Sequence, residues 1–185
     1  MQHGGVLPLK RLVQLDSTTL AHVCASSEVP VWLPDPMPPG WNLAGVAAVG
    51  DQRSRLRATV TAFRGPAPLG GEGEWLIVAE EPGIGLGSGY AQVREPDRLG
   101  DETDGPPAKI QAQGHPTSLW AVGSQARDRS GYLGEAAGVW LWLVSYPADA
   151  GYAVLEDLAL SDARTSSHWP SADTPSTDRL RPGVA

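Results

Sequence analysis

The longest uninterrupted apolar run in the chain is Val139–Tyr146, VWLWLVSY, which lies between Gly138 and Pro147. If this run is a strand, its side chains alternate between two faces. One face then carries Trp140, Trp142, Val144 and Tyr146, and the other carries Val139, Leu141, Leu143 and Ser145. A strand that is apolar on both faces is normally covered on both, so we expect this run to lie inside a sheet.

The region before this run predicts a hairpin followed by a third strand. Trp41–Val49 forms the first strand, Gly50, Asp51 and Gln52 supply the turn, and Arg55–Phe63 forms the second strand. Glu74–Glu80, EWLIVAE, follows a loop of glycine and proline. The second strand alternates in polarity, which predicts one buried and one solvated face. The side chains expected inward are Leu56, Ala58, Val60 and Ala62, and those expected outward are Arg55, Arg57, Thr59 and Thr61.

Shorter elements are predicted in the second half of the chain. Arg94–Pro107 is acidic and poor in apolar residues, which is typical of a solvated loop. Two short strands, Ala108–Ala112 and Ser118–Val122, flank Gly114-His115-Pro116, and Tyr132–Ala136 precedes the long apolar run. The period of Tyr152–Leu160 fits either a strand or a helix, and we assign a strand.

The N-terminal part predicts one helix and one extended arm. Leu20, Val23 and Cys24 recur at helical spacing after Ser17, which is a suitable N-cap. Val29–Gly40 contains five prolines and must be extended or turning, with Trp32 and Leu33 attaching it to the core.

These elements predict a mostly β, β-rich α+β fold. We expect an antiparallel sheet or half-open barrel of about seven short strands with one short N-terminal helix. Residues 1–28 form an N-terminal segment with that helix, residues 29–162 form a single domain, and residues 163–185 form a disordered tail because they are polar and proline-rich.

Composition narrows the classes of partner and site. The formal net charge of −7 and pI of about 5.0 argue against a nucleic acid or an anionic membrane as the partner. The single cysteine, Cys24, excludes an intramolecular disulfide, and we expect it to be part of the core. His3, His22 and His168 have no spacing that suggests a metal site. Because no signal peptide or apolar span is evident, we expect a cytoplasmic protein.

Four motifs, in order, resemble a family of small actinobacterial proteins of unknown function. They are PVWLPDPMPPGW, GPAPLGGEGEWLIVAEEPGIGLG, GHPTSLW and GEAAGVWLWLVSYPADAG, spread over Val29 to Arg164. The resemblance implies an N-terminal zinc-ribbon-like segment just ahead of an HG-x-V-x-PL stretch. His3–Leu9 resembles that stretch, but no cysteine pair precedes it, so either the ribbon is lost or the chain starts downstream of it. Some members of the family are labelled phosphotransacetylase.

The glycine stretch Pro82–Tyr90 is the first candidate site. Glycines at alternate positions after a strand resemble phosphate-cradling loops, in which backbone N–H groups approach a ligand. The spacing fits neither the dinucleotide fingerprint nor the Walker loop. The segment also lacks helical periodicity, so we expect a glycine-rich turn or bulge without a helix. The candidate ligand-binding residues are Gly83, Gly85, Gly87, Ser88, Gly89 and Trp120.

Acid–base chemistry has three weak candidates, His115, Glu81 and Glu135. Glu80 and Glu81 end one strand and Glu135 precedes another, so these carboxylates converge at one rim if the strands are neighbours. Carboxylates at strand ends are also commonly just solvated. A lone histidine in a turn is mostly structural, and as a base it needs a nearby carboxylate.

Two functions from different classes remain open. The first is a non-catalytic, ligand- or protein-binding or regulatory module without a cofactor or metal. The alternative is a small enzyme of acyl- or phosphoryl-group transfer that uses residues 83–89 with His115 and a glutamate.

Overall fold

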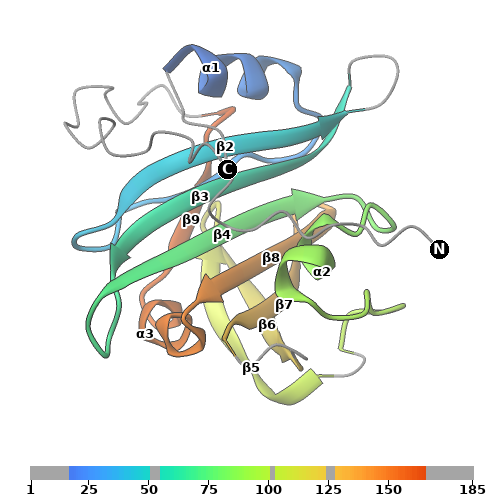
Figure 1. The fold of residues 1–185 in the computed structure, drawn as a ribbon. Helices are drawn as coiled ribbons and strands as arrows, with labels where there is room; N and C mark the ends of the chain where they lie inside the picture. The colour runs from blue at the N-terminus through green and yellow to red at the C-terminus, as the bar shows by residue number, and fades with distance from the viewer. Residues whose placement is uncertain (1–16, 51–54, 101–102, 124–127, 166–185) are drawn as a thin grey trace, which may run out of the picture.

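The computed structural model describes residues 17–50, 55–100, 103–123 and 128–165 of the chain. Nine strands form a single curled sheet in the order β1-β9-β5-β6-β7-β8-β4-β3-β2, which makes an open half-barrel (Figure 1). All neighbouring strands are antiparallel except β5 and β9, which run parallel over Gln111 and Ala112.

Helical segments lie before β1, between β4 and β5, and between β8 and β9. The strands are β1 (Trp32–Pro34), β2 (Asn42–Gly50), β3 (Leu56–Pro66), β4 (Glu72–Glu80), β5 (Thr103–Ala112), β6 (His115–Val122), β7 (Ser130–Ala136), β8 (Val139–Tyr146) and β9 (Ala159–Asp162). The helices are α1 (Ser17–Ser26), α2 (Leu86–Ala91), α3 (Tyr152–Leu155) and the 3-10 turn η2 (Ala148–Ala150).

The apolar run of residues 139–146 is an interior strand, as predicted. β8 lies between β4 and β7, and its two faces contribute to two different clusters of buried side chains. We call the face with Leu141 and Leu143 the inner face and the face with Trp140 and Trp142 the outer face. The inner face is covered by β1, α1 and α3, and the outer face by α2 (Figure 1).

The solvated face predicted for β3 is wrong. Thr59 and Thr61 are buried, because the proline-rich arm crosses the inner face of β3. Thr59 Oγ1 donates to the carbonyl of Pro30 at 2.6 Å, and Thr61 Oγ1 donates to the carbonyl of Trp32 at 2.7 Å. The two hydroxyls therefore satisfy backbone carbonyls of the arm that the sheet ladder does not reach.

The arm and the first hairpin follow the sequence prediction in other respects. Trp32 and Leu33 are buried, so they do attach the arm to the core. Helix α1 forms at the predicted place, and its Leu20 and Val23 pack into the inner cluster. Cys24 is half-buried against the same cluster, where burial, followed by the charge of Asp162, raises its pKa from 9.0 to about 11.

The predicted number of elements was too small. The arm contains a short strand, β1, and the loop assigned to residues 94–107 contains the start of β5. Residues 152–160 were predicted as one strand, but they begin as helix α3 and become strand β9 only at Ala159. A four-residue helix is too short to show a period, which explains why the pattern was ambiguous. Most of the predicted C-terminal tail lies outside the described residues.

Candidate functional site

The glycine stretch closes over a buried carboxylate at the end of β4. Glu80 continues the outward alternation of Leu76 and Val78, and its side chain is 0 % exposed. Its neighbour across the sheet is Trp140 on β8, which in turn lies opposite Glu135 on β7. Glu80 is therefore part of the outer face, where a charge has little access to water.

Two backbone N–H groups at the start of α2 bind this carboxylate. The N–H of Leu86 donates to Glu80 Oε2 at 2.8 Å, and the N–H of Gly87 donates to Oε1 at 3.2 Å. The first N–H groups of a helix have no partner within the helix, so Glu80 satisfies two of them. A negative charge at this end also interacts favourably with the helix dipole.

The sequence prediction that no helix follows the glycines was wrong. Helix α2 has only six residues, including two glycines, and its intrinsic propensity is poor. It forms because Glu80 caps its first turn and because Tyr90 and Ala91 are buried in the outer cluster. This anchor comes from tertiary structure and leaves no helical period in the sequence.

Burial dominates the electrostatics of Glu80. Loss of water raises the pKa of Glu80 from 4.5 to about 7, although the N–H groups of Leu86 and Gly87 lower it. The charge of Glu95 raises the pKa further. The indole N–H of Trp142 faces the carboxylate and lowers its pKa slightly, but it lies outside hydrogen-bonding geometry and stays without a partner. Glu80 is thus poised to change protonation near neutral pH.

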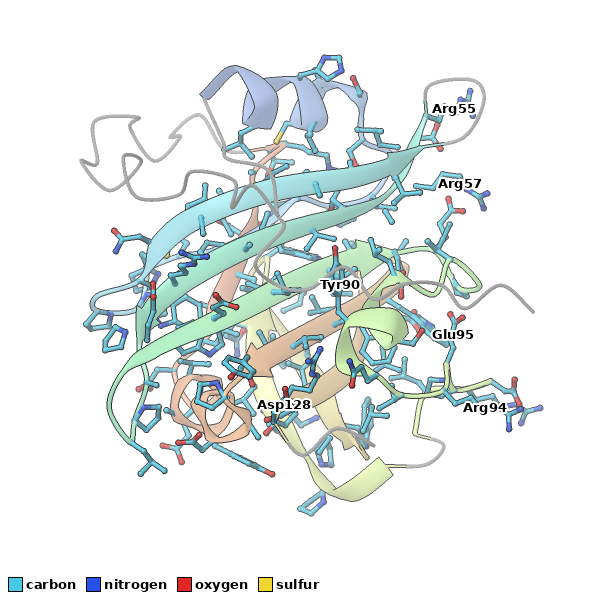
Figure 2. The ribbon with its side chains drawn as sticks, viewed as in Figure 1. Arg55, Arg57, Tyr90, Arg94, Glu95 and Asp128 are labelled. Atoms are coloured by element: carbon cyan, nitrogen blue, oxygen red, sulfur yellow. The ribbon has the colours of Figure 1, made fainter. Side chains whose placement is uncertain are left out.

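A second carboxylate binds the turn from the other side. Glu95 lies on the segment that follows α2 (Figure 2), and its Oε1 accepts the N–H of Gly83 at 2.9 Å. Gly83 and Gly85 have φ values of +92° and +76°, which favour glycine because side chains are strained there. Ser88 Oγ donates to the carbonyl of Gly85 at 3.1 Å, so this hydroxyl also holds the turn.

Gly87 is required by the contact between α2 and the sheet. A Cβ atom at this position would lie 2.2 Å from Cγ and Cδ1 of Trp142, which is fully buried. Gly89, two residues later, has open space around its Cα. The glycine at 87 therefore lets the helix backbone rest on the indole ring, while the glycine at 89 has no such packing role.

The chemistry of this region is that of an occupied anion site. The N–H groups of Gly83, Leu86 and Gly87 point at carboxylates, as they would at a phosphate in a nucleotide-binding loop. Here the anions belong to the chain itself, in Glu80 and Glu95. Of the predicted ligand residues at 83–89, Gly83 and Gly87 therefore have their N–H donors engaged by carboxylates of the protein.

The other predicted site residues do not gather around this turn. His115 is the first residue of β6, and Gln113 and Gly114 form the turn before it. Alternation from Thr117 and Leu119 places His115 on the inner face, opposite to Glu80. Its side chain is exposed. Because β6 begins three residues before the predicted strand start at Ser118, the placement of His115 within the turn was wrong.

Of the three glutamates, Glu80 and Glu135 come nearest to the convergence that the sequence predicted. Glu80 on β4 and Glu135 on β7 are both paired with Trp140 on β8, which lies between these two strands. Two strand spacings separate their backbones by about 10 Å. Glu81 points away to an ion pair with Arg57, whose Nε donates to Glu81 Oε2 at 2.7 Å. Trp120 lies on the outer face, opposite Leu133 on β7, and is half-buried.

Glu81 was a predicted candidate, whereas Glu80 was named only as the end of a strand and Glu95 was not named. A signal for Glu80 was present in the alternation of β4, since Leu76, Val78 and Glu80 share a face with the apolar residues of β8. Glu95 lies in a segment without periodicity, and its contact with Gly83 depends on the path of α2.

A second feature lies at the other end of the sheet. Four large apolar side chains are exposed among the described residues: Val49 at 41 %, Leu69 at 87 %, Tyr146 at 38 % and Tyr152 at 66 %. Leu69 is in the β3–β4 turn, Tyr146 ends β8 opposite Glu74, and Tyr152 starts α3. Figure 1 shows this turn and α3 at the same end of the half-barrel. We call Leu69, Tyr146 and Tyr152 the apolar end, and Val49 is not part of it.

Acidic side chains surround the apolar end. Glu72 and Glu156 are exposed, and Glu74 and Asp149 are half-buried there. Arg64 forms an ion pair with Glu74, with 3.5 Å between Nη2 and Oε1, and its Nε lies 4.0 Å from Oε1 of Glu72. We call Glu72, Glu74, Asp149 and Glu156, which lie on the same elements as the three apolar side chains or next to them, the acidic rim.

Within the described ranges, no three His, Cys, Asp or Glu side chains are grouped so as to hold a metal ion. None of the helices in those ranges is both long and apolar enough to cross a membrane.

Comparison with known proteins confirms the family resemblance and adds no activity. No curated protein and no solved structure matches the chain. The chain does match a family of unknown function (DUF6758) over residues 1–177, which is nearly its whole length. The protein therefore belongs to this family of unknown function.

Proposed function

We propose that the chain is a non-catalytic, cytoplasmic binding module that recognises a protein partner through its apolar end. The observation that carries this proposal is the position of Leu69, Tyr146 and Tyr152 at one end of the half-barrel. Tyrosine in particular is enriched at protein interfaces, because its ring supplies contact area and its hydroxyl a hydrogen bond.

The surroundings of the apolar end suggest the chemistry of the partner. Glu72, Glu156 and Asp149 provide an acidic rim around the apolar side chains. A complementary surface presents apolar side chains with lysine or arginine around them. Leu69 follows the rigid Pro66–Pro68 stretch and precedes Gly70 and Gly71, both with positive φ, so the turn presents its tip outward.

The test is a quantitative pull-down from a lysate of the source organism. It compares wild type with a Leu69→Ser/Tyr152→Ser double variant and with a Val49→Ser control, which removes an exposed apolar residue at the opposite end of the sheet. We expect partners held by wild type and the control to be lost, at least about tenfold, by the double variant. Retention of the same proteins by the double variant contradicts the proposal.

The second candidate function, group transfer at residues 83–89, is favoured by one observation. A buried carboxylate with a pKa of about 7, such as Glu80, is typical of catalytic acids and bases. Against it stand the engaged N–H groups of the turn and the position of His115 on the other face.

A thermal-shift screen separates the two candidates. Nucleotides, acyl-CoA compounds and inorganic phosphate are added to wild type and to a Glu95→Gln variant, in which the Gly83 N–H has lost its charged partner. A ligand at a hundred times its dissociation constant adds about 2.7 kcal/mol to the stability. A binding module gives no shift, whereas a shift that grows in the Glu95→Gln variant favours the enzyme.

A further inference from the structure

The outer faces of β3 and β4 carry four buried apolar side chains. Val60 and Ala62 on β3 lie opposite Val78 and Leu76 on β4. None of the four is more than 5 % exposed. All four belong to the outer cluster, and we call the surface that they form the β3–β4 face. Burial to this extent means that other residues lie on top of this face.

Helix α2 covers only part of the outer face. Apart from the strands themselves, the described members of the outer cluster come from α2 and from the segment that follows it. Helix α2 packs mainly on β8, β4 and β7. The elements that pack across β3 are α1 and β1, and both contribute to the inner cluster. Within the described ranges, no helix or strand therefore covers the outer face of β3.

Tyr90 indicates that the outer cover extends beyond α2. Its side chain lies on the side of α2 that faces β4 (Figure 2), yet it is only 3 % exposed. This loss of water raises the pKa of Tyr90. Arg94 and Glu95, on the segment that follows α2, lie on the opposite side of the helix (Figure 2). The cover of Tyr90 and of the β3–β4 face must therefore come from another part of the chain.

The two ends of the chain are the segments long enough to supply this cover. Residues 51–54, 101–102 and 124–127 only connect described segments, whereas residues 1–16 precede α1 and residues 166–185 follow β9. Helix α1 packs on β2, the last strand of the sheet, and on β3. Sixteen extended residues reach up to about 50 Å, and the backbones of β2 and β4 are about 10 Å apart. The chain before Ser17 can therefore pass the edge at β2 and reach the β3–β4 face.

Composition selects the N-terminal end over the C-terminal end. Residues 5–15, GVLPLKRLVQL, contain six large apolar side chains, whereas residues 166–185 contain only Trp169, Leu180 and Val184 among many polar residues and prolines. Covering an apolar, uncharged face is favourable for an apolar segment, because both surfaces are removed from water. The match to the family also begins at residue 1, so the N-terminal residues are part of the family's sequence pattern.

We propose that residues 5–15 of the chain dock on the β3–β4 face and complete its outer cover. Pro8 has no N–H and restricts Leu7 to an extended conformation. In an extended stretch Leu7 and Leu9 point to the same side, so both leucines can pack on this face. The outer face is then closed by two segments, α2 over β8 and residues 5–15 over β3. This face is therefore occupied by the chain itself and is not open to an external partner.

The test measures how accessible the β3–β4 face is in the full chain. Ala62→Cys is made together with Cys24→Ala, so that the chain has a single thiol on this face. Its rate of labelling by iodoacetamide is compared with that of Leu69→Cys in the same background, at a position that is 87 % exposed. We expect the thiol at position 62 to react at least about a hundredfold more slowly, because the reagent reaches it only after local opening. Equally fast labelling at the two positions overturns the proposal.

Substitutions in the two ends of the chain identify the covering segment. Leu7→Ser/Leu9→Ser should accelerate labelling at position 62 by at least about tenfold, because the segment loses apolar burial. The matched control, Trp169→Ser/Leu180→Ser, should leave the rate unchanged. A rate that rises only in the control, or that rises in neither variant, contradicts docking of residues 5–15. Circular dichroism checks that each variant keeps its fold.

Photochemical cross-linking gives a readout that does not depend on weakening the contact. Leu9 is replaced by p-benzoylphenylalanine in the full chain, the protein is irradiated, and the linked peptides are identified by mass spectrometry. We expect links to peptides that contain β3 or β4, and links confined to other elements overturn the proposal. The pull-down is a separate test, because its variants leave residues 5–15 and the β3–β4 face unchanged.

Discussion

The two faces of the sheet are covered by segments that are held in different ways. On the inner face, the arm around β1 is held by neutral hydroxyls of Thr59 and Thr61, which donate to backbone carbonyls. The carboxylate of Asp162 also holds it, because its Oδ1 accepts the N–H of Val31 at 3.1 Å. On the outer face, α2 is held by the carboxylate of Glu80, which accepts backbone N–H groups. The two hydroxyl anchors of the inner cover do not ionise, whereas the outer cover depends on a group that titrates near neutral pH.

The outer cover also has the tighter fit. The α2 backbone rests on Trp142 at Gly87, where no side chain can be added without moving the indole. The arm on the inner face instead brings in its own large side chains, Trp32 and Leu33. The inner face is thus filled by large side chains of the arm, whereas α2 packs closely on the outer face because Gly87 has no side chain.

The largest expected effect comes from adding a methyl group at Gly87. Gly87→Ala should lower the free energy of unfolding by about 3 kcal/mol, because its Cβ would lie 2.2 Å from the Trp142 ring. Chemical denaturation measures the loss. The matched control is Gly89→Ala in the same helix, which meets nothing within 4 Å and should be neutral or slightly stabilising. Equal losses in both variants would show that the contact with Trp142 is not what requires Gly87.

The second effect concerns the pH dependence of the outer cover. Because the pKa of Glu80 rises from 4.5 to about 7 on folding, the folded state binds a proton more tightly than the unfolded state. Stability from this group is therefore fully present below pH 4.5 and is lost as the pH rises through 7. The loss is about 3 kcal/mol.

Glu80→Gln should remove this pH dependence, since glutamine does not ionise. The free energy of unfolding of wild type and variant is compared at several pH values between 4.5 and 8 by urea denaturation. We expect the two curves to diverge in slope across this window. Parallel curves would mean that Glu80 does not titrate there.

A smaller effect is expected for the hydroxyl that holds the arm. Thr61→Val keeps the shape of the side chain but leaves the carbonyl of Trp32 without its donor, which costs about 1 kcal/mol. Thr61→Ser retains the hydroxyl and serves as the control. Proteolysis or hydrogen exchange of residues 29–36 should become faster in the valine variant only. The loss should be the same at pH 5 and pH 8, unlike that at Glu80.

The smallest effect is expected at the neighbouring carboxylate. Glu81→Gln removes the ion pair with Arg57, whose side chain is 44 % exposed. Exposed ion pairs contribute little, so we expect a change below about 0.5 kcal/mol in denaturation experiments. A loss at Glu81 as large as that at Glu80 would show that burial does not distinguish the two residues.

The sequence predicted well the strands that carry a clear pattern of apolar side chains. The strand at residues 139–146 was predicted from its uninterrupted apolar run, and the hairpin at residues 41–63 from the alternation of its second strand and the turn residues before it. Thr59 and Thr61 were wrongly predicted to be exposed. Threonine is suited both to a solvated face and to a buried face where its hydroxyl can bind a carbonyl. The crossing of the arm over β3 leaves no trace in β3 itself.

The candidate site was predicted only in part. The glycines drew attention to residues 83–89 because a run without side chains allows close approach by another group. That group could not be identified from the sequence. The alternation of β4 places Glu80 at the turn, and the path of the chain after α2 places Glu95 there. Glu80 is distinguished by its burial, which arises from the packing of β4 between β3 and β8 and beneath α2.

The two carboxylates at the glycine turn have a consequence for any external anion. Glu80 and Glu95 are tethered internal ligands, present at the N–H groups of Gly83, Leu86 and Gly87 in every folded molecule. A tethered group acts at an effective concentration of millimolar or more. Free phosphate would have to compete with this built-in occupant before it could bind. A glycine-rich turn can therefore have the geometry of an anion receptor while its own chain keeps it full.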